Sequence, residues 1–335
     1  MDSINDNHNN IIIFTIARMN PPTPGHLYLI SCLINEAIKN NVNDVYIFLS
    51  KSNDDNENPI ACSEKVDVLG DYNDTSNKMI YSEKQKMIAK NPELESKINS
   101  INVHVICTPD ISGATPFTPL IEFIKTKEEI PDLHLILVIG GDRKEMIDSI
   151  VDIFLKKRPN VQSVTGVILG REDMGTYKGL EKEQLCGLDM KKVPDSAMSA
   201  SFVRKVVNEC PEKQFVDIYS SYLDPEEIAK LYQSIRHGLQ LPSKKEQKPT
   251  KRKSSSVSKD IKPLKYNYRE TQEGNKTILT LNKEELESIP QIEVESRSKK
   301  TRKVTTDVTG GKKTKRKSRK YKRKSIKKRK TSKKK

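Results

Sequence analysis

The sequence predicts an α/β protein with an open, parallel five-stranded sheet, helices on both faces, and a disordered basic tail. Short apolar runs alternate with helical patterns along the first part of the chain. Beyond it, the composition changes to Lys, Ser, Thr and Pro, which cannot bury a core. We therefore expect a disordered N-terminus at residues 1–10, one α/β domain at residues 11–240 and a mostly disordered tail at residues 241–335.

Five apolar runs, rich in β-branched residues, have the composition of strands that are buried on both faces of a sheet. Parallel strands need long crossover connections, and these are almost always right-handed. The helical patterns between the runs provide such connections. The predicted strands are Ile11–Ala17, Val45–Ser50, Ile101–Ile106, Leu133–Ile139 and Ser163–Leu169.

Apolar residues three or four positions apart predict helices between and after the strands. The predicted helices are Gly25–Asn40, Met79–Lys90 with a continuation over Pro92–Asn99, Phe117–Lys127, Lys144–Lys157, Ser199–Glu209, Glu212–Ser221 and Pro225–His237. Residues 60–77 have neither period, so we expect an insertion there. Gly170–Asp195 is predicted to be a long polar loop, and a loop of this length in a compact domain commonly serves as a lid or substrate-binding segment.

The charge is divided unevenly along the chain. Residues 1–242 carry 26 Lys and Arg against 35 Asp and Glu, a net charge of −9, whereas residues 243–335 carry 34 against 10, a net charge of +24. Residues 311–335 hold 17 basic residues and no acidic one. Such a run favours sequence-independent binding to nucleic acid or another polyanion. A nuclear address or a solubilising extension are alternatives. Within the tail, Tyr266–Ile292 is one weakly apolar island.

Cysteine usage and apolar segments bear on the compartment. The five cysteines are scattered and odd in number, with no C-x-x-C pair, which is typical of a reducing compartment and gives no sign of a metal site. Residues 1–10 do not resemble a signal peptide, and no apolar run approaches the roughly 18 residues of a membrane span. We therefore expect a cytoplasmic protein that is not secreted and has no membrane partner. The cysteines are Cys32, Cys62, Cys107, Cys186 and Cys210.

The turn after the first predicted strand reads Arg18-Met19-Asn20-Pro21-Pro22-Thr23-Pro24-Gly25-His26. Its prolines and glycine cannot lie inside a strand or helix, so this stretch connects the two. His26 then falls in the first turn of the following helix. Backbone N–H groups without helical partners and the positive end of the helix dipole make this a favourable place for a phosphate.

A second loop-to-helix junction reads Met198-Ser199-Ala200-Ser201-Phe202-Val203-Arg204. Its hydroxyls and N–H groups suit phosphate oxygens, and Arg204 lies one turn beyond Ser201 on the same helix face. The fourth predicted strand ends at Gly140-Gly141-Asp142-Arg143. Open parallel sheets bind ligands beyond the carboxyl ends of their strands, so we expect this turn to converge with the first.

Thr23-Pro24-Gly25-His26 and the Ser199–Arg204 run resemble the two signatures of the nucleotidylyltransferase superfamily, T/H-x-G-H and S-S/T-T/S-x-x-R. The resemblance covers roughly residues 11–235 and is closest to members from phages and large DNA viruses, whose substrates are generally unassigned. If the protein is viral, its expected compartment is the host cytoplasm or nucleus. It implies a Rossmann-like fold and transfer of a nucleotidyl group, AMP from ATP, to a small phosphorylated metabolite with release of pyrophosphate. Mg²⁺ would accompany the triphosphate, held by phosphate oxygens and water and not by a cluster of protein ligands.

The resemblance also implies roles for individual residues. Catalytic roles fall to His26, Thr23 and Arg204, although Thr23 stands where many members have His and cannot carry charge. The residues expected to bind the nucleotide are Asn20, Gly25, His26, Gly141, Asp142, Ser199, Ala200, Ser201 and Arg204. By position at the same edge of the sheet, we expect Arg18, Lys51 and Arg143 to bind the acceptor's phosphate.

Several alternatives stay open. CTP could replace ATP, but cytidylyltransferases tend to carry Arg-Thr-x-Gly where this chain has Val193–Ala197, which favours ATP. Ser199 or Asp142 could be only a helix cap, and Arg18, Lys51 or Arg204 only a solvated charge. The protein could also be a non-catalytic nucleotide-binding or nucleic-acid-associated protein with the same fold, or one whose function lies in its tail. We expect deletion of residues 243–335 to spare nucleotide turnover.

Overall fold

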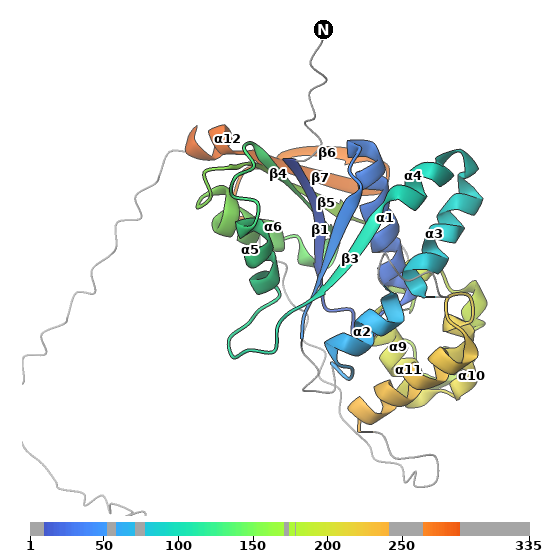
Figure 1. The fold of residues 1–335 in the computed structure, drawn as a ribbon. Coiled ribbons are helices and arrows are strands. Elements are labelled where there is room, and N and C mark those ends of the chain that lie inside the picture. The colour runs from blue at the N-terminus through green and yellow to red at the C-terminus, as the bar shows by residue number, and fades with distance from the viewer. Residues whose placement is uncertain are drawn as a thin grey trace, which may run out of the picture. The chain divides into compact units, whose positions relative to one another are not determined.

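The computed structural model describes residues 10–51, 58–70, 78–170, 174–177, 179–240 and 264–288. In this part of the chain, seven strands form one mixed sheet in the order β3-β2-β1-β4-β5-β7-β6 (Figure 1). The predicted α/β class is therefore confirmed. The strands are β1 (Ile11–Ala17), β2 (Asp44–Leu49), β3 (Asn102–Cys107), β4 (Leu133–Gly140), β5 (Val161–Leu169), β6 (Arg269–Glu273) and β7 (Lys276–Asn282).

The predicted number of five strands is wrong. β1 to β5 are parallel as expected, but β7 pairs antiparallel with β5 and β6 pairs antiparallel with β7. Burial of Leu279 and Leu281 of β7 in the core, together with the pairing of β7 with β5, holds the hairpin on the sheet. This hairpin comes from the segment where we expected mostly disorder. The predicted disordered residues 1–9 and the basic run 311–335 lie outside the described residues.

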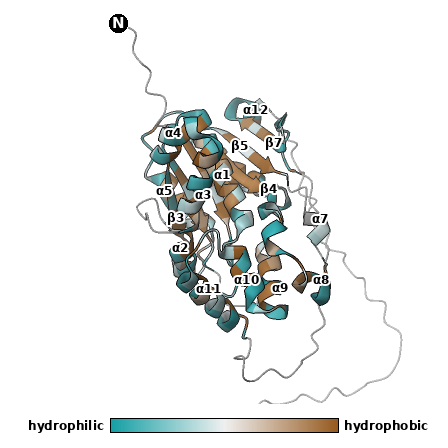
Figure 2. Ribbon diagram, turned by 90° about the vertical axis from the view of Figure 1, so that its right-hand side faces the viewer, coloured by the Kyte–Doolittle hydropathy of each residue, from teal (hydrophilic) through white to brown (hydrophobic). Residues whose placement is uncertain are grey.

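Alternate residues of the central strands point to opposite faces of the sheet, so each face has its own core. In β1, Ile13 and Ala17 belong to one cluster of buried apolar side chains, whereas Ile12, Phe14 and Ile16 belong to the other. This explains why β1 reads as a continuous apolar run and not as an alternating one. Figure 2 shows the hydrophobic strands enclosed by helices whose outer surfaces are more hydrophilic.

The helices divide between the two faces (Figure 1). The first face carries α1 (Pro24–Asn40), α2 (Cys62–Leu69), α3 (Met79–Lys90), α4 (Glu95–Ser100), α9 (Ala200–Glu209), α10 (Glu212–Tyr219) and α11 (Pro225–Gly238). The second carries α5 (Phe117–Lys125), α6 (Met146–Ile150) with a π-helical continuation over Val151–Leu155, and α12 (Lys283–Ser288).

Two segments are more ordered than their polar composition suggested. The predicted loop 170–195 contains α7 (Met174–Tyr177), α8 (Lys182–Cys186) and a 3₁₀ turn at Met190–Lys192. It is anchored because Leu185, Met190 and Val193 are buried. The predicted insertion 60–77 contains α2, which is anchored by Val68 and Leu69, while residues 71–77 lie outside the described part.

The cysteine interpretation also needs correction. All five cysteines lie in the described part of the chain, and four of them form the disulfides Cys62–Cys107 and Cys186–Cys210. Cys32 is a buried free thiol. The paired residues are 45 and 24 positions apart, so neither pair forms a short motif that the sequence could have revealed. Because four of the five cysteines are paired, cysteine usage no longer supports the expected reducing compartment.

Candidate functional site

The first motif places His26 in a fixed orientation at the start of α1. Thr23 precedes the helix with extended backbone, and its N–H donates to His26 Nδ1 over 3.1 Å. The hydroxyl Oγ1 of Thr23 lies 2.9 Å from the same nitrogen. A backbone N–H can only donate, so Nδ1 is the acceptor and the proton of the neutral imidazole lies on Nε2. The ring therefore has a hydrogen-bond donor on its other side, which suits a phosphate oxygen.

Thr23 itself is buried, and its hydroxyl is directed at His26. The resemblance implies a catalytic role for Thr23. In the structure its hydroxyl contacts the imidazole, so it orients His26.

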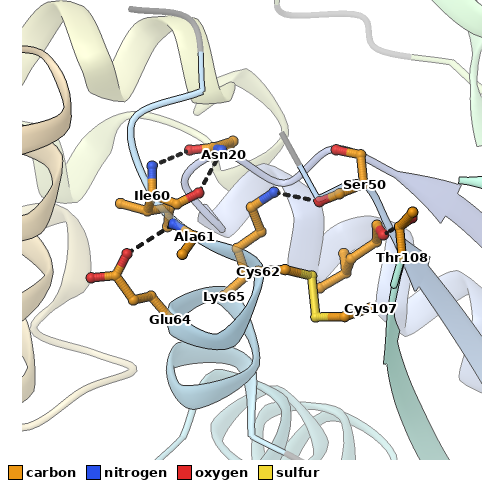
Figure 3. The surroundings of a disulfide bond; sticks show 10 residues. Asn20, Ser50, Ile60, Ala61, Cys62, Glu64, Lys65, Cys107 and Thr108 are labelled. Carbon is orange, nitrogen blue, oxygen red and sulfur yellow. Dashed lines mark hydrogen bonds between the residues drawn. A yellow bond between two sulfur atoms is a disulfide. The ribbon is translucent and has the colours of Figure 1, made fainter. Parts of the chain in front are cut away.

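Asn20, another residue of the first motif, is also fully buried. Its Nδ2 donates to the carbonyl of Ile60 at 2.9 Å, and its Oδ1 accepts from the Ile60 N–H at 3.0 Å (Figure 3). Both polar ends of the side chain are thus used to tie the turn after β1 to the segment that enters α2. These bonds give the Asn20 side chain a structural role, and its contact with the nucleotide stays a prediction.

The second motif forms the N-terminus of α9. Ser199 is the N-cap residue, and its Oγ accepts a hydrogen bond from the Phe202 N–H at 3.2 Å. The same oxygen lies 2.9 Å from Oγ of Ser201, which is exposed, and Ala200 is half-buried between them. Ser199 is therefore a cap, but capping leaves the Ser201 hydroxyl at the surface of the helix N-terminus.

The two motifs are in direct contact. The Nη1 of Arg204 donates to the backbone carbonyl of Asn20 at 2.5 Å. A Cβ atom on Gly25 would lie 2.8 Å from the carbonyl oxygen of Met198 and 3.1 Å from that of Asp195. Only glycine allows this approach, which brings the start of α1 against the turn before α9. The N-termini of two helices therefore flank one region at the carboxyl edge of the sheet.

The turn before α9 is held from outside by a polar cluster. Tyr222 donates from its hydroxyl to Asp195 Oδ2 at 2.6 Å, and Lys86 Nζ lies 3.9 Å from that oxygen and 3.6 Å from the centre of the Tyr222 ring. Burial, with the neighbouring Asp195 carboxylate, raises the pKa of Tyr222, and burial lowers the pKa of Lys86. Tyr219 adds a further link, because its hydroxyl donates to the Pro22 carbonyl at 2.6 Å.

A buried lysine that the sequence analysis missed lies near the first motif (Figure 3). Lys65 of α2 is fully buried, and its Nζ donates to the Ser50 carbonyl at 2.8 Å. Burial, and to a lesser degree the charge of Arg18, lowers its pKa to about 8. The Cys62–Cys107 disulfide joins the same helix to the end of β3. No sequence signal pointed to Lys65, because it lies in the segment without a clear period.

The three residues expected to bind the acceptor differ from one another in what they contact. Lys51 Nζ donates to the Ile111 carbonyl at 2.9 Å and lies 3.5 Å from Asp110 Oδ1, so its charge is directed at the connection after β3. Arg143 Nε lies 3.9 Å from Asp142 Oδ2 at the end of β4. Arg18 is exposed and close enough to affect Lys65. In the contacts that the structure describes, these three cations therefore have different neighbours and do not form one cluster.

Gly141 and Asp142 begin a 3₁₀ turn directly after β4 and line a pocket of about 380 Å³. Its other walls come from the end of β5 and from the β6–β7 hairpin. The hairpin residues were missed because they lie in the predicted tail. The wall residues beyond the β4 turn are Ile168, Leu169, Gly170, Gln272, Gly274, Asn275 and Thr277.

Comparison of the chain with protein-family models, with curated proteins and with solved structures gives no match. Within the described ranges, no helix has both the length and the apolar character needed to cross a membrane. Across the same ranges, no group of three or more His, Cys, Asp or Glu side chains is arranged to hold a metal ion.

Proposed function

We propose that the protein is a nucleotidylyltransferase that transfers AMP from ATP to a small, phosphate-bearing acceptor and releases pyrophosphate. The proposal is supported above all by the hydrogen bond from Arg204 to the Asn20 carbonyl, together with the close approach of Gly25 to Met198. These contacts join the two stretches that resemble the superfamily's signatures. Two helix N-termini beside one another are suited to a polyphosphate chain, which carries several negative charges.

The proposed reaction follows from the hydrogen-bond donors at the N-termini of α1 and α9. MgATP binds with its phosphates between the N-termini of α1 and α9. An oxygen of the acceptor's phosphate attacks the α-phosphorus, the bond to the bridging oxygen of the β-phosphate breaks, and pyrophosphate leaves with that electron pair. His26 donates from Nε2–H to an α-phosphate oxygen, and Ser201 with the first N–H groups of α9 donates to the leaving pyrophosphate. Alignment and charge stabilisation supply the catalysis, so no covalent nucleophile is needed.

Arg204 acts in this scheme through position as well as charge. Its guanidinium is a planar fork of N–H donors, a shape that matches phosphate oxygens, and its bond to the Asn20 carbonyl holds this fork beside the first motif. ATP is favoured over CTP because Val193–Ala197 lacks the Arg-Thr-x-Gly pattern of cytidylyltransferases. Residues 311–335 would add a separate, salt-sensitive attachment to nucleic acid or another polyanion.

The test is pyrophosphate release from MgATP in the presence of a panel of phosphorylated acceptors. We expect His26→Ala to lower turnover about 10²–10³-fold, which is typical for loss of one transition-state donor. His237→Ala is the matched control, because His237 is exposed on α11 and should keep wild-type turnover. If the wild type binds ATP but releases no pyrophosphate with any acceptor, the protein is a non-catalytic nucleotide-binding protein and the proposal fails.

A further inference from the structure

The tip of the β6–β7 hairpin is fixed at the same edge of the sheet as the two motifs. β7 runs antiparallel to β5 with Lys276 opposite Leu169, so the hairpin turn lies beside the carboxyl end of β5. The Gly170 N–H donates to the Asn275 carbonyl at 2.9 Å, and Asn275 Nδ2 donates back to the Gly170 carbonyl at 3.3 Å. A Cβ on Gly170 would lie 2.9 Å from the backbone carbonyl oxygen of Asn275, so a larger residue would force the tip to shift.

The pocket beneath this tip has the chemistry of a site for an uncharged, partly polar group. Among the described residues that line it, none is Lys or Arg, and Asp142 contributes a negative charge. A phosphate would therefore be unfavourable there. Ile168 and Leu169 supply apolar surface. Small-molecule sites typically combine such apolar walls with a few placed polar groups.

The polar wall is a cross-strand pair on the hairpin. Gln272 and Thr277 lie opposite one another. Gln272 Nε2 donates to Thr277 Oγ1 at 2.9 Å, and the Thr277 hydroxyl donates to Gln272 Oε1 at 3.1 Å. Both residues line the pocket together with Asp142, and Thr277 alternates along β7 with Leu279 and Leu281, so the pair lies on the α6 face of the sheet. Amide, hydroxyl and carboxylate groups can bind the hydroxyls of a ribose and the edge of a base.

The distance from the motifs fits one nucleotide. β1, β4 and β5 are consecutive neighbours in the sheet, and adjacent strands are about 4.8 Å apart. The pocket begins at the ends of β4 and β5, on the order of 5–10 Å across the sheet from the turn after β1, and its wall on β7 and β6 lies on the order of 14–19 Å from that turn. An extended nucleoside triphosphate is long enough to reach this wall. Phosphates held between α1 and α9, on the first face, would leave the nucleoside end to cross the carboxyl edge of the sheet to the pocket.

We infer that the β6–β7 hairpin forms one wall of the nucleoside site, with the ribose and base between Gly141–Asp142 and the Gln272–Thr277 pair. This inference rests on the proposed function. It assigns discrimination among bases to a segment that lies outside the stretch resembling the superfamily. The hairpin is then a specificity element of the site and not only an extra edge for the sheet.

The test compares two probes that differ only in the nucleoside. We would titrate the full-length protein with MgATP and with magnesium tripolyphosphate by calorimetry, for the wild type, Gln272→Leu and Thr277→Val. We expect ATP affinity to fall about tenfold in each variant, the size typical of one lost hydrogen bond, and tripolyphosphate affinity to stay unchanged. Thr271→Val is the matched control, because strand alternation places Thr271 on the opposite face of β6.

The outcomes separate this inference from the proposed function. Unchanged ATP affinity in both variants would overturn the hairpin's role while leaving the nucleotidylyltransferase proposal intact. Equal weakening of ATP and tripolyphosphate would mean that the substitutions disturb the whole edge of the sheet, which also overturns the inference. If the wild type binds ATP, CTP, GTP and UTP no more tightly than it binds tripolyphosphate, the protein has no nucleoside site and the inference is refuted. A wild type that binds none of these probes would refute the proposed function itself.

Discussion

The guanidinium of Arg204 donates a hydrogen bond to the backbone carbonyl of Asn20, a residue 184 positions earlier in the chain. The Asn20 side chain is in turn bonded at both ends to Ile60. Three segments that are distant in sequence therefore meet at the turn after β1. The geometry of this turn depends on α9 and on the entry to α2 as much as on its own residues.

Gly25→Ala should separate the two motifs. The added Cβ would lie 2.8 Å from the Met198 carbonyl oxygen, a backbone atom that cannot rotate away, so we expect a loss of about 1–3 kcal/mol in the free energy of unfolding. Gly141→Ala is the control, since its Cβ would have no neighbour closer than 3.7 Å. Urea unfolding of both variants measures the difference. Equal stability of the two would show that the close approach at Gly25 does not constrain the fold.

Substitutions of Ser199 should distinguish capping from phosphate binding. Ser199→Ala removes the acceptor for the Phe202 N–H and should lower stability by about 1 kcal/mol. Ser199→Asp keeps a good N-cap and should keep wild-type stability, but it places a negative charge where we propose the phosphates bind. We therefore expect Ser199→Asp to abolish ATP binding in a titration. Wild-type ATP affinity in Ser199→Asp would mean that the start of α9 is not part of the site.

Lys65→Met should remove a buried charge and change how stability depends on pH. The pKa of Lys65 is lowered to about 8 in the folded state, against an ordinary value of 10.5. Below pH 8 the folded state keeps the buried charge, so the free energy of unfolding of the wild type is lowered. Between pH 8 and about 10.5 the folded state releases this proton before the unfolded state does, and wild-type stability rises relative to the variant.

The change in the stability difference over this range should be on the order of 2–3 kcal/mol. It can be measured as the gap between the urea midpoints of wild type and Lys65→Met at pH 7.5, 9 and 10. Other titrating groups cancel in the comparison because both proteins contain them. A gap that stays constant with pH would mean that Lys65 titrates as an ordinary surface lysine.

Two truncations should separate the basic segment from the hairpin. Deleting residues 311–335 removes 17 Lys and Arg and should abolish salt-sensitive binding to DNA or RNA while leaving ATP affinity unchanged. Deleting residues 243–335 also removes β6 and β7, which exposes the edge of β5 and the core under Leu279 and Leu281. We therefore expect the longer deletion to lower the midpoint of unfolding sharply and to weaken ATP binding. This revises our expectation from the sequence that the longer deletion would spare turnover.

Much of the fold was predictable because local patterns and tertiary packing agree. β1 is a run of apolar residues that is packed between helices on both faces of the sheet, and its predicted range is the observed one. Both motif turns lie where proline, glycine and serine chemistry placed them, at the starts of α1 and α9. The five parallel strands follow from the same alternation of apolar runs and helical patterns.

The remaining features depend on contacts that no short stretch reveals. β6 consists of five exposed polar or charged residues, Arg269–Glu273, and is a strand only because β7 pairs with it. The disulfides join cysteines that are brought together by the fold. Asn20 looked like a ligand-binding residue from its position, but its role depends on Ile60, 40 positions later. The pocket residues on the hairpin were missed for the same reason.

The central claim is that the N-termini of α1 and α9 hold one triphosphate between them. The most direct measurement is a crystal structure of the full chain with Mg²⁺ and a non-hydrolysable ATP analogue. We predict phosphate oxygens within about 3 Å of His26 Nε2 and, in the same molecule of ligand, of Ser201 Oγ or the first N–H groups of α9. An analogue whose phosphates contact only one of the two helices, or bind away from both, would contradict the account.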